Sequence, residues 1–154
     1  MADSINTLLT QIKTDLRAAM AAGELKDTNT PVRDVQDDWD YQIKGPQQLP
    51  LIQYGEVASG SGGYAGDAQN LVPFAIRFIV WVPARGGQYP EAVARARNLR
   101  DSLLDSLHNR RPFGKAGAAR QALTFQRETI EFRLAFAAGL SVIVSGNIME
   151  IAGS

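Results

Sequence analysis

The chain contains no cysteine and only one histidine among its 154 residues. Disulfide bonds and cysteine-ligated metal sites are therefore excluded, and a single subunit cannot offer several histidine ligands. An excess of either charge is also missing, since 16 Lys and Arg residues balance 16 Asp and Glu residues. This balance is not typical of general nucleic-acid-binding proteins, which carry a basic excess. It allows copies of the chain to approach one another without strong repulsion.

Long apolar runs are absent too, so the sequence predicts no membrane-spanning helix and no membrane partner. The N-terminal stretch has Asp3 and several polar residues between its apolar ones, which is not the pattern of a secretory signal. We therefore expect synthesis in the cytoplasm. The length fits one domain that covers residues 1–154.

Two segments have helical periodicity. Apolar residues recur at spacings of three and four along residues 4–22 (Ile5, Leu8, Leu9, Ile12 and Leu16) and along residues 89–111 (Val93, Ala96, Leu99, Leu103 and Leu107). Gly23 is a natural stop for the first helix, and Pro90 is favourable in the first turn of the second. The charged residues Lys13, Asp15 and Arg17 are expected to face solvent.

Four other segments, residues 51–57, 71–82, 122–136 and 140–151, have the composition and alternation of strands. The last is expected to be one strand or a pair of strands, since Gly146 interrupts it. In the segment 71–82 one face is entirely apolar: Val72, Phe74, Ile76, Phe78, Val80 and Val82. Ile79 and Trp81 point to the other face, which we expect to be partly covered. Phe125 is out of phase with the apolar face that Ile130 begins, and this mismatch predicts a bulge near residues 127–129.

The predicted elements follow the order helix, long connection, strand, loop, strand, helix, strand, strand. This order is not the strict alternation of strands and helices that builds a parallel sheet. We therefore expect an α+β fold in which an antiparallel or mixed β-sheet has two α-helices packed on one face.

The long connection, residues 26–50, is polar, rich in proline and irregular, with a short strand or turn expected at residues 39–43. Four aspartates crowd into its stretch RDVQDDWD: Asp34, Asp37, Asp38 and Asp40. The stretch lacks the ligand spacing and the turn glycine of a calcium loop, and no second catalytic group accompanies it. A solvated acidic surface, which repels a polyanion or meets a basic partner, is therefore favoured over a metal or acid–base site. Trp39 could anchor the segment onto the domain or onto a neighbouring molecule.

A second irregular segment, residues 58–67, is rich in glycine and serine. Residues 60–65 fit G-x-G-x-x-A, a form of the dinucleotide-binding fingerprint, but a strand is predicted where the fingerprint needs a helix. A small nucleotide-binding enzyme is thus a secondary hypothesis. The others are a plain surface loop and a mobile loop that becomes ordered against another protein, with Tyr64 as its main contact. The candidate interface residues are Trp39, Ser59, Gly60, Gly62, Gly63, Tyr64 and, in the turn after the longest strand, Arg85.

After its leading helix, the chain carries the stretches PLIQYGEV (50–57), FAIRFIVWVPA (74–84), EAVARARNLRDSLLDSLHN (91–109) and FQRETIEFRLAFAAGLSVIV (125–144). In order and character these segments resemble the small tail terminator (tail completion) proteins of long-tailed bacteriophages, over residues 4–151. The resemblance implies a structural protein of the virion tail and neck, not an enzyme, of which six copies form a ring. Such a ring caps the tail tube, ends its polymerisation and offers a surface to the head connector or other neck proteins.

The resemblance also has implications for partners and site residues. A closed ring requires heterologous contacts between different patches of neighbouring copies, and genomic DNA passes through its lumen without specific binding. The four aspartates of residues 34–40 would suit such a lumen, whereas Arg110 and Arg111 would be better placed outside it. No cofactor, metal or catalytic residue is expected. Another ring protein of the neck, such as a head-closure or adaptor component, is an alternative that the sequence separates poorly from a terminator.

Overall fold

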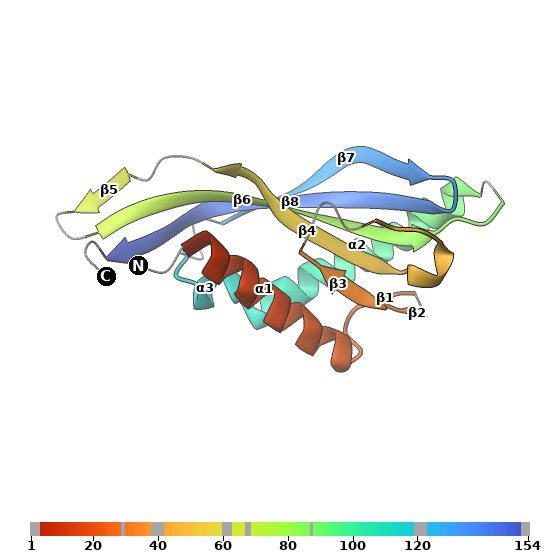
Figure 1. Cartoon of the computed structure of the whole chain (residues 1–154), viewed down its shortest axis with the longest axis horizontal. Helices are drawn as coiled ribbons and strands as arrows, with labels where there is room; N and C mark the ends of the chain where they lie inside the picture. Colours follow the sequence, from red (N-terminus) through yellow and green to blue (C-terminus); the bar gives the residue numbers. More distant parts are fainter. Residues whose placement is uncertain are drawn as a thin grey trace.

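The computed structural model describes residues 4–28, 30–37, 42–59, 63–66, 69–86, 88–118 and 123–151. Its helices are α1 (Ser4–Ala21), α2 (Tyr89–Arg110) and the single turn α3 (Pro112–Lys115), with a 3-10 turn, η1 (Pro46–Gln48). Its strands are β1 (Lys26–Asp27), β2 (Thr30–Pro31), β3 (Asp34–Gln36), β4 (Leu51–Ser59), β5 (Gly63–Gly66), β6 (Gln69–Pro83), β7 (Thr124–Leu134) and β8 (Ala137–Ile151). Figure 1 shows an elongated molecule in which the longest strands run along the main axis.

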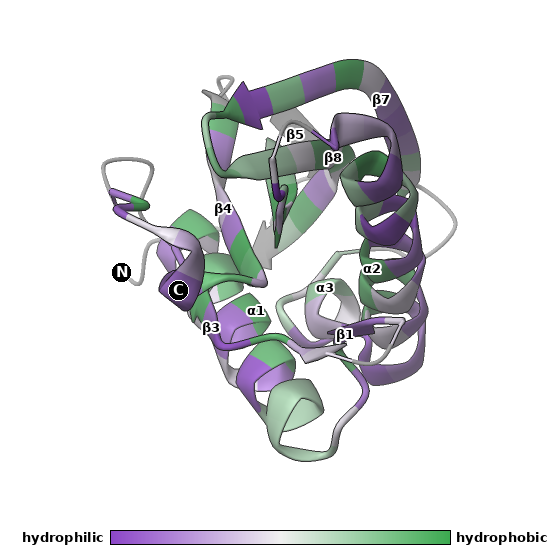
Figure 2. Ribbon diagram, turned by 90° about the vertical axis from the view of Figure 1, so that its right-hand side faces the viewer, coloured by the Kyte–Doolittle hydropathy of each residue, from purple (hydrophilic) through white to green (hydrophobic). Residues whose placement is uncertain are grey.

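The strands form one large mixed sheet in the order β3-β4-β6-β8-β7, and β5 pairs with the beginning of β6. β3 is parallel to β4, and the other pairs of this sheet are antiparallel. β1 and β2 form a separate two-stranded ladder. The helices lie on one face of the large sheet (Figure 1, Figure 2). The predicted α+β fold, with two long helices on one face of a mixed sheet, is confirmed.

The main core lies between the sheet and the helices. The predicted apolar face of β6 supplies Phe74, Ile76, Phe78, Val80 and Val82, all buried, while Val72 packs at its margin. The predicted stripes of α1 and α2 meet this face. Phe78 stacks on Tyr54 of β4, whose hydroxyl donates a 2.9 Å hydrogen bond to the Leu9 carbonyl of α1. Burial raises the pKa of Tyr54, so the phenol stays protonated and remains a donor.

α1 ends where the sequence predicted, because Gly23 adopts a left-handed conformation with φ of +75°. The amides of Gly23 and Glu24 bond to carbonyls of the last turn at 3.1 and 2.9 Å, the pair of bonds that defines a Schellman cap. The expectation that Asp15 faces solvent is wrong. Asp15 is 5% exposed and accepts hydrogen bonds of 3.0 and 3.2 Å from Lys115 of α3. The periodicity of α1 could not reveal this, since α3 comes from a distant part of the chain.

A second, smaller apolar cluster lies on the opposite face of the sheet, the outer face. Leu49, Leu51, Ile79, Trp81 and Ala137 form it, and Ile43, Phe132, Leu134 and Phe136 pack against it. Trp81 is 7% exposed and donates a 3.3 Å hydrogen bond to Gln53. Its ring lies over Gly139, where a Cβ atom would come within 2.8 Å of it. The outer face is therefore covered at this end, as the apolar character of Ile79 and Trp81 predicted.

The predicted bulge in β7 lies between Arg127 and Glu131, where the register against β8 shifts. It moves the apolar pattern of β7 from one face to the other, so that Phe125 packs on the helix-side core and Phe132 packs on the outer cluster. Ile130, expected to share the apolar face, is instead 57% exposed, because it lies within the bulge.

Polar side chains make hydrogen bonds with the backbone and with one another at this bulge. Glu128 pairs with Arg77 (Nε to Oε1, 2.7 Å) and accepts a 2.7 Å hydrogen bond from Ser141 Oγ. The Arg100 guanidinium of α2 donates to the carbonyls of Glu128 and Ser141 at 3.2 and 3.1 Å. Burial lowers the pKa of Arg100. The bulge is thus held by side chains from β6, β8 and α2.

The connection of residues 26–50 is more regular than expected. β1 and β2 form their small ladder beside α2, and β3 joins the edge of the large sheet next to β4. The short strand or turn expected at residues 39–43 is not confirmed, because residues 42–44 have no regular structure and residues 38–41 lie outside the described part. Strands of two or three residues pair through their backbones and leave no alternating pattern in the sequence.

Candidate interaction surfaces

Two of the four aspartates of residues 34–40 lie beside basic residues of α1. Lys13 Nζ is 3.3 Å from Asp37 Oδ1, and Arg17 Nη2 is 3.7 Å from Asp34 Oδ1. Both carboxylates belong to half-exposed side chains, so this edge of the sheet presents a surface of mixed charge. The other predicted residues of this segment, Asp38, Trp39 and Asp40, lie outside the described residues.

The glycine-rich stretch is a shorter loop than the sequence indicated. β4 extends to Ser59, and Gly63–Gly66 forms β5, in which Gly63 pairs with Leu71 and Tyr64 with Asn70. The expectation of an open loop over residues 58–67 is therefore wrong at residues 58–59 and 63–66, because glycine can pair through its backbone like any other residue. Residues 69–83 are strand β6 and not the helix that a dinucleotide fingerprint requires. The predicted positions Gly60 and Gly62 lie outside the described residues.

The far ends of the long strands project beyond the helices. Figure 1 shows β5, the beginning of β6 and the end of β8 extending past α1 and α3. The antiparallel pairing of β6 with β8 continues to Gln69 and Ile151. We call this projection the strand arm and define it as residues 63–66, 69–71 and 149–151. Its β6 residues pair with β5 on one side and β8 on the other, and Figure 1 shows no helix beneath it.

Apolar side chains follow the uncovered part of the outer face. Leu71, Pro73 and Ala75 of β6 share that face with Ile143 and Met149 of β8. All five are at least partly exposed, and Met149 is 45% exposed. We call these residues the outer strip. Arg77, Ser145 and Asn147 share the same face, so the strip is apolar with polar residues between its members. Exposed apolar side chains gathered on one face make the outer strip a candidate interaction surface.

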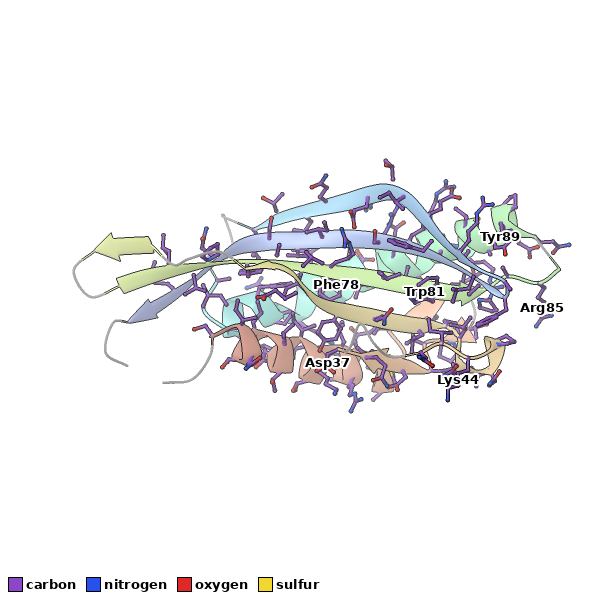
Figure 3. All side chains as sticks on the ribbon, turned by 45° about the horizontal axis from the view of Figure 1, so that its top comes forward. Asp37, Lys44, Phe78, Trp81, Arg85 and Tyr89 are labelled. Carbon is purple, nitrogen blue, oxygen red and sulfur yellow. The ribbon has the colours of Figure 1, made fainter. Side chains whose placement is uncertain are left out.

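Arg85 lies at the opposite end of the molecule from β5 (Figure 3). It borders a shallow depression between the β1–β2 turn and the start of α2, together with Glu91 and Arg95. Arg95 Nη2 is 2.7 Å from Oδ2 of Asp27, which is 1% exposed. This end of the subunit therefore presents a polar surface of both charges.

A pocket of about 280 Å³ opens at the C-terminal end of α2, between this helix, α3 and the start of β7. Leu107, Phe113, Leu123 and Phe125 form its apolar wall. His108 and Arg111 also border it, and both are exposed, which places them at the rim. The His108 ring lies 4.5 Å from the Phe125 ring, between centroids.

The sequence did not indicate this pocket, because its walls come from three elements that only the fold brings together. One local feature draws attention to it. Arg111 has φ of +54°, a left-handed conformation at the junction of α2 and α3 where glycine is common. A side chain at such a position costs roughly 1 kcal/mol in backbone strain. A cation at the C-terminal end of a helix complements the helix dipole, which offsets part of this cost.

Within the described ranges, no group of three His, Asp or Glu side chains could hold a metal ion. In the same part of the chain, no helix is long and apolar enough to cross a membrane. Comparison with models of known protein families gives no match, and a search of curated proteins finds no similar sequence. The surfaces of the molecule are therefore the basis for inferring its function.

Proposed function

We propose that this chain is a structural virion protein that forms a ring on the tail tube of a long-tailed bacteriophage, ends tube polymerisation and joins the tail to the head connector. The observation that carries this proposal is the one-sided sheet. Helices cover one face, whereas the outer strip and the strand arm have no covering layer among the described residues. Such uncovered strand surface suits a protein that works through contacts with other proteins.

The positions of the candidate surfaces support a cyclic assembly. The strand arm and Arg85 lie at opposite ends of the long axis (Figure 3), and β3 and β7 occupy opposite edges of the sheet. A contact between two such different patches is heterologous, and repeated heterologous contacts close into a ring when the rotation is right. The balanced charge of the chain favours close packing of its copies.

The charge at the β3 edge supports passage of DNA through the ring. We propose that residues 34–40, with their four aspartates, line the lumen. Phosphate binding strengthens with each Lys or Arg contact, and here Lys13 and Arg17 already face Asp37 and Asp34. A lumen of this kind does not hold the DNA backbone. Arg110, which pairs with Glu24, lies outside it in this proposal.

Native mass spectrometry of the purified protein tests the ring. The proposal predicts that any assembled species contains six copies of the 16.7 kDa chain, about 100 kDa, because heterologous contacts with a closing rotation give a ring of fixed copy number. Six copies are expected at the latest when the chain docks on the tail tube, so a monomer of the free protein does not decide between the outcomes. An isologous dimer, or a ladder of open oligomers with no closed species, contradicts it.

A further inference from the structure

We infer that the groove between β7 and α2 receives an extended segment of another protein, which adds a strand to the edge of the sheet. The segment carries a basic, a large apolar and an acidic residue at alternate positions. Its apolar side chain fills the pocket at the end of α2, and its charged side chains lie on either side of that pocket. This contact joins the chain to a different protein, and so goes beyond the contacts between copies proposed above.

β7 is an edge strand. It ends the strand order β3-β4-β6-β8-β7, and each of its residues is at least partly exposed. Before the bulge, Thr124 to Arg127 pair regularly with β8. On their other side, these residues have no strand partner in the described part of the chain. Such an edge presents N–H and C=O groups that an added strand can bind.

Two hollows that share His108 and Phe125 form the groove beside this edge. One is the apolar pocket of about 280 Å³, and the other, of about 430 Å³, extends to Asp101 and Arg127. The Phe125 ring lies 4.5 Å from the His108 ring, between centroids, and Arg127 lies 3.3 Å from Asp101. β7 and α2 therefore run in opposite directions along the groove. Figure 2 shows both on the same side of the molecule.

The apolar pocket has the size and lining for one large side chain. Its volume of about 280 Å³ lies just below the roughly 300 Å³ at which pockets for whole small molecules begin. Phe113 and Leu107 are 1% and 2% exposed and form its floor, while Leu123 and Phe125 are half-buried and available for contact. Phe113 and Phe125 meet edge to face with 6.3 Å between ring centroids, which leaves ring faces for a third aromatic group.

The two ends of the groove carry opposite charges. Arg111 borders the apolar pocket, which has no acidic residue in its described lining, and Asp105 borders the other hollow. Both are exposed, and neither makes an ion pair within the described residues, whereas Asp101 pairs with Arg127. A guanidinium binds a carboxylate through two parallel hydrogen bonds. The groove thus favours an acidic residue at the Arg111 end and a basic residue at the Asp105 end.

The spacing of these charges suits an extended segment. Arg111 lies six residues after Asp105, which is about 9 Å along a helix. Alternate side chains of a strand face the same side, so residues two before and two after the apolar one are about 13 Å apart. Long charged side chains reach inward over the difference. An antiparallel addition, the more stable kind, runs with α2, so the basic residue comes first in the segment.

A second copy of this chain cannot supply the segment. The alternation of basic, large apolar and acidic residues occurs twice in the sequence, at residues 33–37 and 97–101. The middle residues, Val35 and Leu99, are both fully buried in the core of the subunit. Presenting either of them to the groove would require unfolding, so the segment belongs to a different protein.

Fluorescence anisotropy with a labelled synthetic peptide, Gly-Lys-Thr-Phe-Thr-Glu-Gly amide, tests the groove on the natural protein. The peptide should bind saturably. Replacing its phenylalanine by alanine, or its glutamate by lysine, should weaken binding at least about tenfold, because each change removes one of the two anchoring contacts. Equal affinities for the three peptides, or no saturation at millimolar concentration, overturns the inference.

A charge reversal in the protein identifies the residue that meets the glutamate. Arg111→Glu should reverse the preference, so that the peptide with lysine in place of glutamate binds more tightly. Arg85→Glu is the matched control, since it makes the same change of charge at an exposed residue beside the start of α2 and should keep the natural preference. The same preference in both variants overturns the role of Arg111.

Methylation of single backbone nitrogens in the peptide tests the added strand. Successive N–H groups of a strand point to opposite sides, so only one of two neighbouring N–H groups can bond to β7. N-methylation at the phenylalanine and at the threonine after it should therefore differ at least about tenfold in effect on the affinity. Equal effects at the two positions overturn the strand addition.

Discussion

Glu128 is the residue on which the irregular part of the sheet depends. Its carboxylate binds Arg77 and Ser141, and its carbonyl accepts a hydrogen bond from Arg100. The hydrogen bond from Arg77 holds the pKa of Glu128 below its ordinary value of 4.5, and the same contact raises the pKa of Arg77. This one residue thus connects β7 to β6 and β8 through its carboxylate and to α2 through its carbonyl, at the point where the β7–β8 ladder is interrupted.

We expect Glu128 to make folding stability depend on pH in the acid range. Its pKa is lower in the folded than in the unfolded state, so its contribution is complete above about pH 4.5 and is lost as the pH falls through the folded-state pKa. Glu128→Gln should lower the free energy of unfolding by roughly 1–2 kcal/mol at neutral pH. The free energy of unfolding of this variant should also decrease less steeply as the pH falls. Urea unfolding at a series of pH values measures both. Glu24→Gln, at an exposed ion pair with Arg110, is the control and should change the profile less. Identical profiles for wild type and Glu128→Gln would refute the assignment.

At Gly139, the absence of a Cβ atom is what allows the Trp81 ring to pack against the backbone. A methyl group there would lie 2.8 Å from Cε3 of Trp81, which is closely enclosed by the outer cluster. Gly139→Ala should therefore lower the free energy of unfolding by about 1–3 kcal/mol through overpacking. Gly114→Ala is the matched control, since the space around Gly114 is open. Denaturant midpoints of the two variants provide the comparison, and equal midpoints would show that Trp81 moves aside freely.

At the scale of elements, the β3 edge is fixed by backbone pairing rather than by its charges. Three residues of β3 pair with β4 through their backbones. The ion pairs at this edge are exposed: Lys13 pairs with Asp37, which follows the strand, and Arg17 pairs with Asp34, which begins it. Exposed pairs of this kind contribute roughly 0–1 kcal/mol each. The charge of this edge is therefore free to serve a partner or a lumen.

We expect the simultaneous change of Asp34, Asp37 and Asp38 to Asn to leave the fold nearly intact. The thermal midpoint should fall by only a few degrees, because the lost ion pairs are exposed. A chelator should not change the midpoint of the natural protein, since no metal is expected at these residues. A large drop with chelator would show that the segment holds a cation after all.

The elements that the sequence predicted well are those with long patterns. α1, α2 and β6 each present an apolar face many residues long, so periodicity alone locates them. The bulge in β7 was also predictable, from the phase change between Phe125 and the residues after it. β1, β2, β3 and β5 were not, because pairing through the backbone alone leaves no side-chain pattern. The pocket beside Arg111 was hidden for a related reason, since residues distant in sequence form its walls.

At the scale of the whole molecule, helices cover one face of the sheet, whereas the other face is covered only at the end where Trp81 lies. The outer strip occupies the remainder, next to the strand arm. Burying such a surface between copies gains hydrophobic free energy that the isolated subunit cannot obtain.

Met149→Glu should weaken assembly without weakening the fold. The Met149 side chain is 45% exposed, so a carboxylate there should change the free energy of unfolding of the subunit little. In an interface that covers the outer strip, the same carboxylate would be buried without a partner, which is unfavourable. The share of assembled protein in sedimentation experiments should fall, with an unchanged thermal midpoint for the dissociated subunit. Ala94→Glu, on the exposed side of α2, adds the same charge and should assemble normally. Normal assembly of both variants would exclude the outer strip from the interface.

The central claim is the proposed ring on a phage tail tube, and electron microscopy of tail tubes assembled with and without this chain tests it most directly. The account predicts that tubes grown with the chain stop at a defined length and carry a six-fold ring with an open lumen at one end. Tubes that grow on with bare ends, or that carry a single copy or an open filament in place of a ring, would contradict it.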